Sequence, residues 1–228
     1  NEIGKAIHDY DGFLVVDGIQ HVGQEFFNTD NVDFVAFGTQ KWLLSPFSLG
    51  ILFISDRALE LTSPPNYGYL NLDVGMSWDQ FWTDINKDPL NNYKLRKGNA
   101  QSYEFGGFYS IPSLIGFMNS LELINQIGID KIRNHVFNLR KILIEELNEL
   151  NAEIISPIDE KNGSGIVTFK LYKDIRENYK LVEELDKRFS IKVSGRGAAG
   201  IGGIRTSIHF PNEENDVFKL LDALKKLK

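Results

Sequence analysis

Two apolar runs near the start of the chain each lead into a polar side chain with reactive chemistry. The first run, Phe13 to Val16, is followed by Asp17, and the second, Phe34 to Phe37, leads through a short polar segment to Lys41. Continuous apolar runs of this length are typical of strands that are covered on both faces, as in an α/β fold. The sequence therefore predicts a carboxylate and an amine at the ends of two neighbouring buried strands.

An acid and an amine in this arrangement suit a cofactor that needs both groups. Pyridoxal phosphate is such a cofactor, because an acidic side chain partners its pyridinium nitrogen and a lysine forms a Schiff base with its aldehyde. Each residue alone has a more ordinary explanation. A lysine after a strand is usually a solvated end residue, and an aspartate there is often a turn or N-cap residue. The pairing of Asp17 with Lys41 favours the cofactor.

Composition restricts the remaining classes of function. The 228 residues suffice for one large domain or two small ones, and the formal net charge of −6 argues against a general nucleic-acid-binding protein. No segment has the length and apolarity of a membrane span, and no secretory signal pattern occurs, so we expect a cytoplasmic protein. With no cysteine, the chain cannot supply a disulfide, a thiolate metal ligand or a cysteine nucleophile. The histidines lack the spacing of a metal site.

The order of predicted elements divides the chain in two. Residues 1–129 contain three predicted strands, an irregular aromatic-rich segment at 64–102 and a long helix from Ile111. Residues 130–228 alternate between helices and strands, with helices predicted at 130–150, 179–189 and 216–227, strands at 153–156, 166–171, 191–193 and 204–210, and a glycine-rich loop at 194–203. We predict two domains, 1–129 and 130–228.

Four segments, in this order, resemble the class V aminotransferase family of fold-type I pyridoxal-phosphate enzymes. They are Val15 to Gly23, Asp33 to Leu43, Tyr103 to Gly107, and Gly203 to Ser207 with the Asn212–Glu214 turn after it. The resemblance implies an α/β fold, namely the C-terminal part of a fold-type I transferase. Residues 1–129 would be part of the large mixed-sheet, cofactor-binding domain, and residues 130–228 the small C-terminal α/β domain. It also implies a homodimer, for which residues 64–102 are a candidate interface.

The resemblance assigns cofactor roles to three residues of the first two segments. Lys41 would form the Schiff base and then act as the general base that moves the substrate's α-proton. Asp17 would keep the pyridine nitrogen protonated, and Gln20 would donate a hydrogen bond to the cofactor's phenolate oxygen.

The remaining candidate residues would bind phosphate or substrate. Thr39 and Gln40 would contact the cofactor phosphate, and Gly107 lies in a segment that reaches the partner subunit's cofactor phosphate. The family usually has a threonine at the position of Gly107, so only a backbone N–H could serve there. Arg205 would bind the substrate α-carboxylate through its planar fork of donors.

These residues indicate an enzyme that acts on a small α-amino acid, with transamination favoured. Desulfurases of the family usually have a histidine immediately before the lysine, where this chain has Gln40, and a catalytic cysteine in the loop that corresponds to residues 194–203. A C–S lyase or an epimerase-like enzyme needs no such cysteine and stays open as an alternative.

A non-catalytic fragment or binding module that has lost its cofactor is an alternative of another class. The family's N-terminal portion carries a phosphate-binding loop and a residue that stacks on the cofactor ring. Neither is found among these 228 residues, which begin with Asn1. We therefore expect the chain to be the C-terminal part of a larger enzyme.

Overall fold

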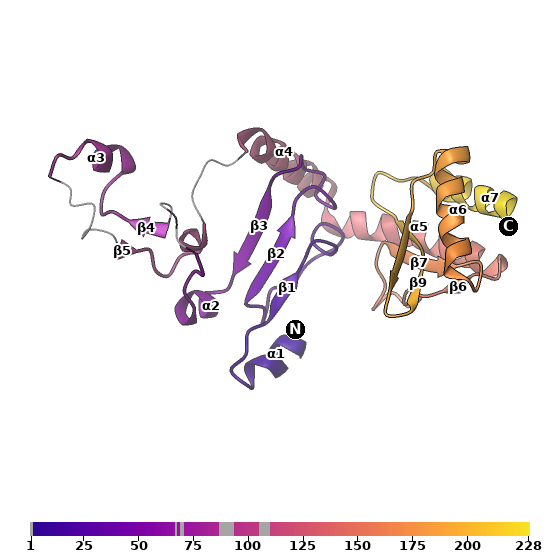
Figure 1. Ribbon diagram of the computed structural model, residues 1–228, viewed down its shortest axis with the longest axis horizontal. Coiled ribbons are helices and arrows are strands. Elements are labelled where there is room, and N and C mark those ends of the chain that lie inside the picture. The colour runs from indigo at the N-terminus through magenta and orange to yellow at the C-terminus, as the bar shows by residue number, and fades with distance from the viewer. Residues whose placement is uncertain (1, 67, 69–70, 87–93, 105–109) are drawn as a thin grey trace. The chain divides into compact units, whose positions relative to one another are not determined.

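The computed structural model of the protein describes residues 2–66, 68, 71–86, 94–104 and 110–228, and these form two compact units (Figure 1). The first unit consists of residues 1–22 and 27–123, and the second of residues 23–26 and 124–228. The domain boundary between residues 129 and 130 stays a prediction. Within the described residues, no helix combines the length and apolarity needed to cross a membrane.

A mixed sheet forms the centre of the first unit. β1 (Val15–Asp17) runs parallel to β2 (Phe34–Gly38), and β2 pairs antiparallel with β3 (Gly50–Ile54). Val35 in β2 is buried, but Val15 in β1 is 67% exposed. The prediction that the first strand is covered on both faces is therefore wrong for this chain. β1 lies at the edge of its sheet, and the face that carries Val15 and Asp17 is open to solvent.

Short helices and a long one accompany this sheet. α1 (Glu2–His8) precedes β1, and α2 (Asp56–Leu61) follows β3 with its first turn capped by the Ser55 hydroxyl, which accepts from the backbone of Ala58. The segment predicted to be irregular contains a two-stranded ribbon and a helix, β4 (Leu72–Asp73), β5 (Lys94–Leu95) and α3 (Trp78–Thr83), before the 3₁₀ turn Ala100–Tyr103. α4 (Ile111–Ile127) agrees closely with the predicted long helix.

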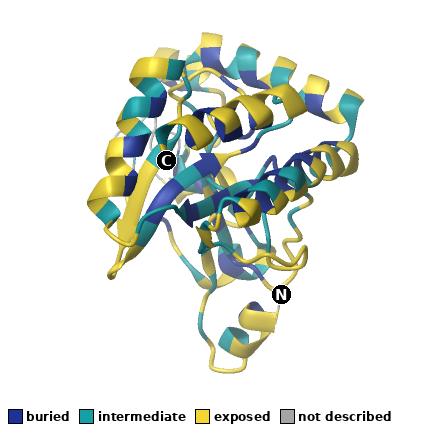
Figure 2. Cartoon of the chain, turned by 90° about the vertical axis from the view of Figure 1, so that its right-hand side faces the viewer, coloured by how far each residue is buried: buried dark blue, intermediate teal, exposed yellow. Residues whose placement is uncertain are grey.

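The second unit packs three helices on an antiparallel sheet. The strands are β6 (Glu153–Ile154), β7 (Ile166–Lys170), β9 (Ile201–Ser207) and β8 (Ser194–Ala198), in that spatial order. α5 (Ile129–Glu149), α6 (Ile175–Phe189) and α7 (Glu214–Leu227) supply the other layer. Val167, Phe169 and Ile204 are completely buried in the common core, and Figure 2 shows buried stripes on helices that are otherwise exposed. Burial of this single apolar face accounts for the amphipathic pattern of the helices.

Two sequence predictions in the second unit are wrong. The short strand expected at 191–193 is absent from this described region, and the expected glycine-rich loop at 194–203 forms the β8–β9 hairpin. The hairpin turns at Ala199 and Gly200, which have φ angles of 50° and 80°. Gly195 and Gly197 have low strand propensity but allow β8 to approach α6, because a Cβ at either would lie less than 3 Å from the Tyr179 side chain, at 2.8 and 2.7 Å.

Candidate functional site

The acid and the amine predicted from the sequence lie at, or shortly after, the carboxyl ends of strands in the first unit's sheet. Because β1 and β2 are parallel, with Asp17 opposite Ala36, their carboxyl ends meet at one edge. Asp17 ends β1, and Lys41 follows the last residue of β2, Gly38, by three positions. Both side chains are exposed, and neither forms an ion pair with any residue that the structure describes. The Asp17 carboxylate accepts a hydrogen bond from the Ile19 backbone at 3.1 Å.

A side-chain hydrogen bond joins the turns that follow the two strands. Trp42 Nε1 donates to Gln20 Oε1 at 3.0 Å, and Trp42, the neighbour of Lys41, is 5% exposed. This bond holds the segment after Asp17 against the segment that carries Lys41. The Gln20 amide also carries N–H groups, the kind of donor that the predicted contact with a ligand oxygen needs.

Thr39 closes the loop that carries Lys41. Its side chain is completely buried, its hydroxyl and its backbone N–H both donate to the Leu49 carbonyl at 3.2 Å, and its own carbonyl accepts from Ser45 at 3.1 Å. The Gln40 side chain folds back over Gly38, where a Cβ would overlap it. In this chain Thr39 therefore shapes the loop, while phosphate contacts by Thr39 and Gln40 stay predictions.

One face of α4 holds the continuation of this loop, a feature that the sequence reasoning missed. Ser113 donates to the Phe47 carbonyl at 2.6 Å, and Ser120 donates to the Leu44 carbonyl at 3.1 Å. Gly116 lies between these serines on the same face of the helix. The signal in the sequence is the placement of small residues at positions 113, 116 and 120, which share one face of the helix.

The backbone of the loop needs this support. Leu44 and Ser48 have φ angles of 51° and 77°, a region that residues with a side chain rarely adopt. Pro46 packs directly on Gly116, where a Cβ would lie 2.5 Å from the proline ring. A larger residue at position 116 would therefore displace the loop that carries Lys41.

Arg205 lies in the second unit, on the inner strand β9 between Thr168 of β7 and Ser194 of β8. Its Nε is buried and has no hydrogen-bond partner among the described residues. Burial lowers the pKa of Arg205, and the like charge of Arg196 adds to the shift. An arginine with an unsatisfied buried donor suits the binding of an anion.

The structure thus brings five of the seven predicted site residues together in the first unit: Asp17, Gln20, Thr39, Gln40 and Lys41. Arg205 belongs to the second unit, and Gly107 lies outside the described residues. The described residues contain no group of three histidine or acidic side chains that could hold a metal ion.

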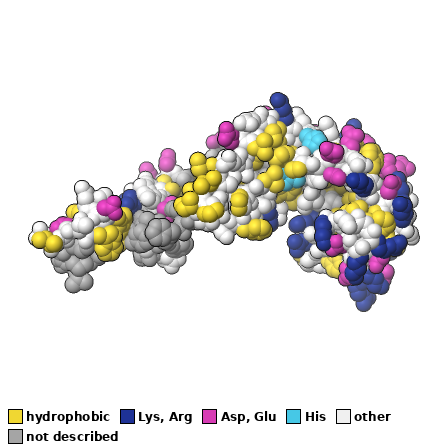
Figure 3. Space-filling view, turned by 90° about the horizontal axis from the view of Figure 1, so that it is seen from above, with side chains coloured by type: hydrophobic (Ala, Val, Ile, Leu, Met, Phe, Trp, Pro, Cys, Tyr) yellow, Lys and Arg dark blue, Asp and Glu magenta, His cyan; other side chains and the backbone are white. Residues whose placement is uncertain are grey.

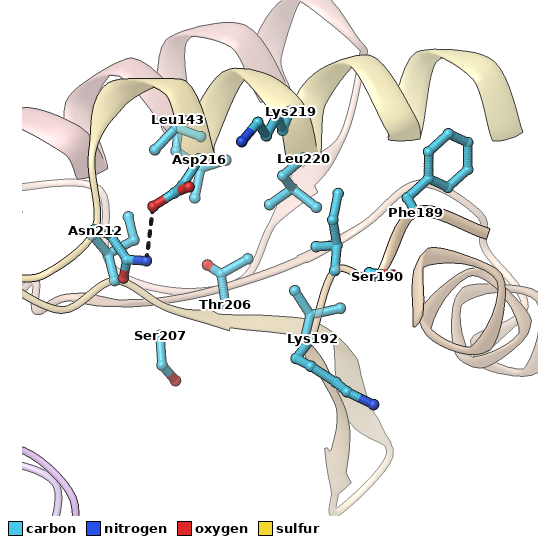
Figure 4. A pocket seen from close by; sticks show the side chains of 14 residues that line it. Leu143, Phe189, Ser190, Lys192, Thr206, Ser207, Asn212, Asp216, Lys219 and Leu220 are labelled. Atoms are coloured by element: carbon cyan, nitrogen blue, oxygen red, sulfur yellow. Dashed lines mark hydrogen bonds between the residues drawn. The ribbon is translucent and has the colours of Figure 1, made fainter. Parts of the chain in front are cut away.

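A cavity of about 470 Å³ in the second unit contains none of the predicted site residues. It lies between β9, α7 and the segment after α6 (Figure 4). Asp216 accepts from Asn212 at 3.2 Å on its wall, in the turn that begins α7, and Lys192 and Lys219 line it. Asn212 and Asp216 therefore belong to the capping of α7.

Comparisons with known proteins agree with this fold. The chain is 26% identical to a probable cysteine desulfurase of Pyrococcus abyssi, over 99% of this chain and 55% of that protein. It is 24% identical to an uncharacterized aminotransferase of Methanocaldococcus jannaschii, over 85% of this chain and 46% of that protein. The chain thus spans about half the length of these relatives.

Solved structures of similar proteins also agree with this fold. The apo cysteine desulfurase of Thermococcus onnurineus superposes with a TM-score of 0.82 at 25% identity, over 99% of this chain and 55% of that one. The cystine C–S lyase C-DES, in complex with cysteine persulfide, superposes with a TM-score of 0.78 at 21% identity, over 98% and 55%. The predicted α/β fold, that of fold-type I pyridoxal-phosphate enzymes, is confirmed. The model of the family described as aminotransferase class-V matches residues 1–220, and the chain therefore belongs to this family.

Proposed function

We propose that the protein to which this chain belongs is a pyridoxal-phosphate-dependent enzyme that transaminates a small α-amino acid. The observation that carries the proposal is the placement of Asp17 and Lys41 on one edge of a parallel strand pair, in a member of the class-V family. The residues at this edge fit the cofactor, since they offer an acid for its ring nitrogen, an amine for its aldehyde and an amide donor. When bound, the cofactor supplies an electron sink for the substrate's α-carbon.

Each residue at this edge has a defined task in the proposal. The Lys41 amine attaches the cofactor and later moves the proton at the substrate's α-carbon, and its exposure leaves the side chain room to do both. The Asp17 carboxylate holds a proton on the ring nitrogen, and Gln20 donates from its amide nitrogen. In the second unit, Arg205 binds the substrate α-carboxylate, which would satisfy its buried Nε.

The phosphate contacts form a separate part of the proposal. The Gln40 amide and the backbone of the loop closed by Thr39 lie directly before Lys41, so they are the local donors for a phosphate group. Gly107 would add a backbone N–H.

A C–S lyase is the second candidate, and the names of the relatives favour it. Several of them are probable cysteine desulfurases, and one structural neighbour is a cystine C–S lyase. A desulfurase that works through a cysteine thiolate is not favoured, because these 228 residues include no cysteine. Elimination from cystine through Lys41 needs no such thiolate.

The Lys41 assignment can be tested by covalent trapping. The complete gene product is incubated with pyridoxal phosphate, reduced with borohydride, digested and analysed by mass spectrometry. We expect the cofactor mass on the peptide that contains Lys41, and its loss in Lys41→Ala but not in Lys5→Ala, a control at an exposed lysine of the same unit. A gene product that takes up no cofactor would support the non-catalytic binding module instead.

The two reactions differ in what they require and release. Transamination needs an α-keto acid acceptor and converts it to an amino acid, whereas elimination from cystine, with one water consumed, releases cysteine persulfide, pyruvate and ammonia without an acceptor. Product analysis with and without 2-oxoglutarate therefore separates them. Pyruvate formed from cystine in the absence of an acceptor would contradict transamination as the main activity.

We also propose that the protein is a homodimer, with residues 64–102 as a candidate interface. Sedimentation velocity of the complete gene product tests this, and a monomer at micromolar concentration would contradict it.

A further inference from the structure

The described helices α5, α6 and α7 share the core with one face of the second unit's sheet, and the opposite face carries cationic side chains. Val167, Phe169 and Ile204 point into the core, so the residues that alternate with them point to the opposite face. Arg205 lies on that face because it follows Ile204 in β9. Arg196 lies opposite Gly203, two positions from Arg205, and therefore shares the face.

The register makes the two arginines diagonal neighbours. Arg205 is paired with Ser194 and Gly203 with Arg196, so the two arginines lie on adjacent strands two residue pairs apart, on the same face of the sheet. The packing of β8 fixes this direction. Gly195 and Gly197 lie against Tyr179 of α6 on the other face, which leaves Arg196 no way to turn toward the core.

Among the residues that the structure describes, no acidic side chain pairs with either of these two charges. Lysine and arginine side chains are numerous on the surface of the second unit (Figure 3). Lys170 on the same sheet is paired with Glu153 at 2.9 Å, but Arg196 and Arg205 form no ion pair in the part of the chain that the structure describes. Two adjacent cations repel each other, and one of them has a buried donor without a partner among the described residues, so anionic groups bound to the two arginines would relieve both costs.

Gly203 adds no side chain of its own beside the arginines. Gly203, opposite Arg196, has no side chain, and a Cβ there would overlap the Phe169 carbonyl oxygen, so the backbone geometry itself excludes a larger residue. The Lys170 side chain borders this position, with its Cγ 3.1 Å from where that Cβ would lie, so a ligand over β9 would meet the two guanidinium groups beside the stem of Lys170.

We propose that Arg196 is a specificity-determining residue that binds a second anionic group of the substrate, which makes the substrate an acidic α-amino acid and its dicarboxylic keto acid. The inference rests on the proposed function, in which Arg205 binds the α-carboxylate. Each guanidinium can take one carboxylate through two parallel hydrogen bonds. A monocarboxylic substrate would occupy Arg205 and leave Arg196 unpaired.

Direct binding to the cofactor-free gene product tests this without any catalysis. Isothermal titration calorimetry compares succinate, a dicarboxylate, with propionate, a monocarboxylate of similar shape. We expect the wild-type protein to bind succinate more tightly than propionate. Arg196→Gln should lower the affinity for succinate about tenfold or more, as for the loss of one charge-assisted contact, and should change the affinity for propionate less than about twofold. Arg205→Gln should weaken both ligands. Arg188→Gln, an exposed arginine of α6 paired with Glu184, is the matched control and should change neither.

Each outcome decides between the two proposals. The inference is overturned if Arg196→Gln lowers the affinities for succinate and propionate equally, or if the wild-type protein does not prefer succinate. Arg196 would then act as a general charge only. If Lys41 carries the cofactor but the succinate preference is missing, the inference fails and the proposed function stands. If the preference is present but Lys41 takes up no cofactor, the proposed function fails while the dicarboxylate site remains.

Discussion

Asp33 is the residue whose substitution should disturb the first unit most, because one carboxylate fastens three segments. Its side chain is 1% exposed and accepts hydrogen bonds from the Leu14 backbone, from His8 of α1 and from Arg57 of α2, each at 2.8 Å. Leu14 directly precedes β1, and Asp33 itself directly precedes β2. The two strands that lead to Asp17 and Lys41 thus share this anchor.

The size of the effect follows from what Asp33→Asn leaves behind. The amide keeps the shape of the carboxylate but removes the charge and turns one acceptor into a donor that faces other donors. Removing one partner of a buried ion pair costs about 3–5 kcal/mol of unfolding free energy. Arg57 is 31% exposed, so water can solvate its remaining charge, and we expect the lower end of that range, about 3 kcal/mol.

Urea unfolding followed by far-UV circular dichroism measures this loss. We expect Asp33→Asn to lower the midpoint by about 1–3 M with an unchanged slope, since slopes of about 1–3 kcal/mol/M are typical. Asp9→Asn removes an exposed carboxylate just after α1 and should stay within about 0.5 kcal/mol of wild type. In a double-mutant cycle, adding Arg57→Gln to Asp33→Asn should cost less than Arg57→Gln alone. A midpoint for Asp33→Asn equal to that of the Asp9 control would refute the reasoning.

Two further predictions concern the stability of the protein at low pH and the packing of the β8–β9 hairpin. Burial raises the pKa of Asp33, but hydrogen bonds from Leu14, His8 and Arg57 outweigh it and hold the pKa below the ordinary 3.8. The contribution of the Asp33 carboxylate to stability is therefore present above about pH 4 and is lost as the pH falls through its folded pKa. The difference in urea midpoint between wild type and Asp33→Asn should consequently become smaller below about pH 4. A difference that is unchanged at about pH 2 would contradict this. Gly203→Ala forces a Cβ against the Phe169 carbonyl and should lower the stability by at least about 1 kcal/mol, measured in thermal melts. Gly50→Ala is the control, because a Cβ there would lie 3.7 Å from its nearest neighbour, and it should leave the stability unchanged. Equal melting points of the two variants would show that β9 can shift.

Local periodicity predicted much of the fold. α4, α5 and β7 begin and end within a few residues of the predicted positions, because their apolar residues recur at helical or strand spacing. The β8–β9 hairpin was missed because its glycines obscured the strand alternation. The glycines are there to pack against Tyr179, a contact that depends on where α6 lies and not on the local sequence.

The site shows the same division between local and long-range information. Asp17 and Lys41 were recognisable because each follows its own strand. Ser113 and Ser120 were missed because their partners, Phe47 and Leu44, are 66 and 76 positions away in the chain. Asp33 was recognised only as the first residue of the segment that leads to Lys41, since nothing in the local sequence places His8 and Arg57 around it.

The residues that would carry the chemistry are exposed, and the residues that position them are buried. Lys41 and Asp17 have few contacts to lose, whereas Asp33, Thr39 and Trp42 hold the strands and the loop from within. Loss of activity alone therefore cannot assign a role in this protein, because a positioning residue removes activity by displacing the loop. A residue that acts chemically should lose cofactor attachment with its urea midpoint unchanged, and a residue that positions the loop should lose both together.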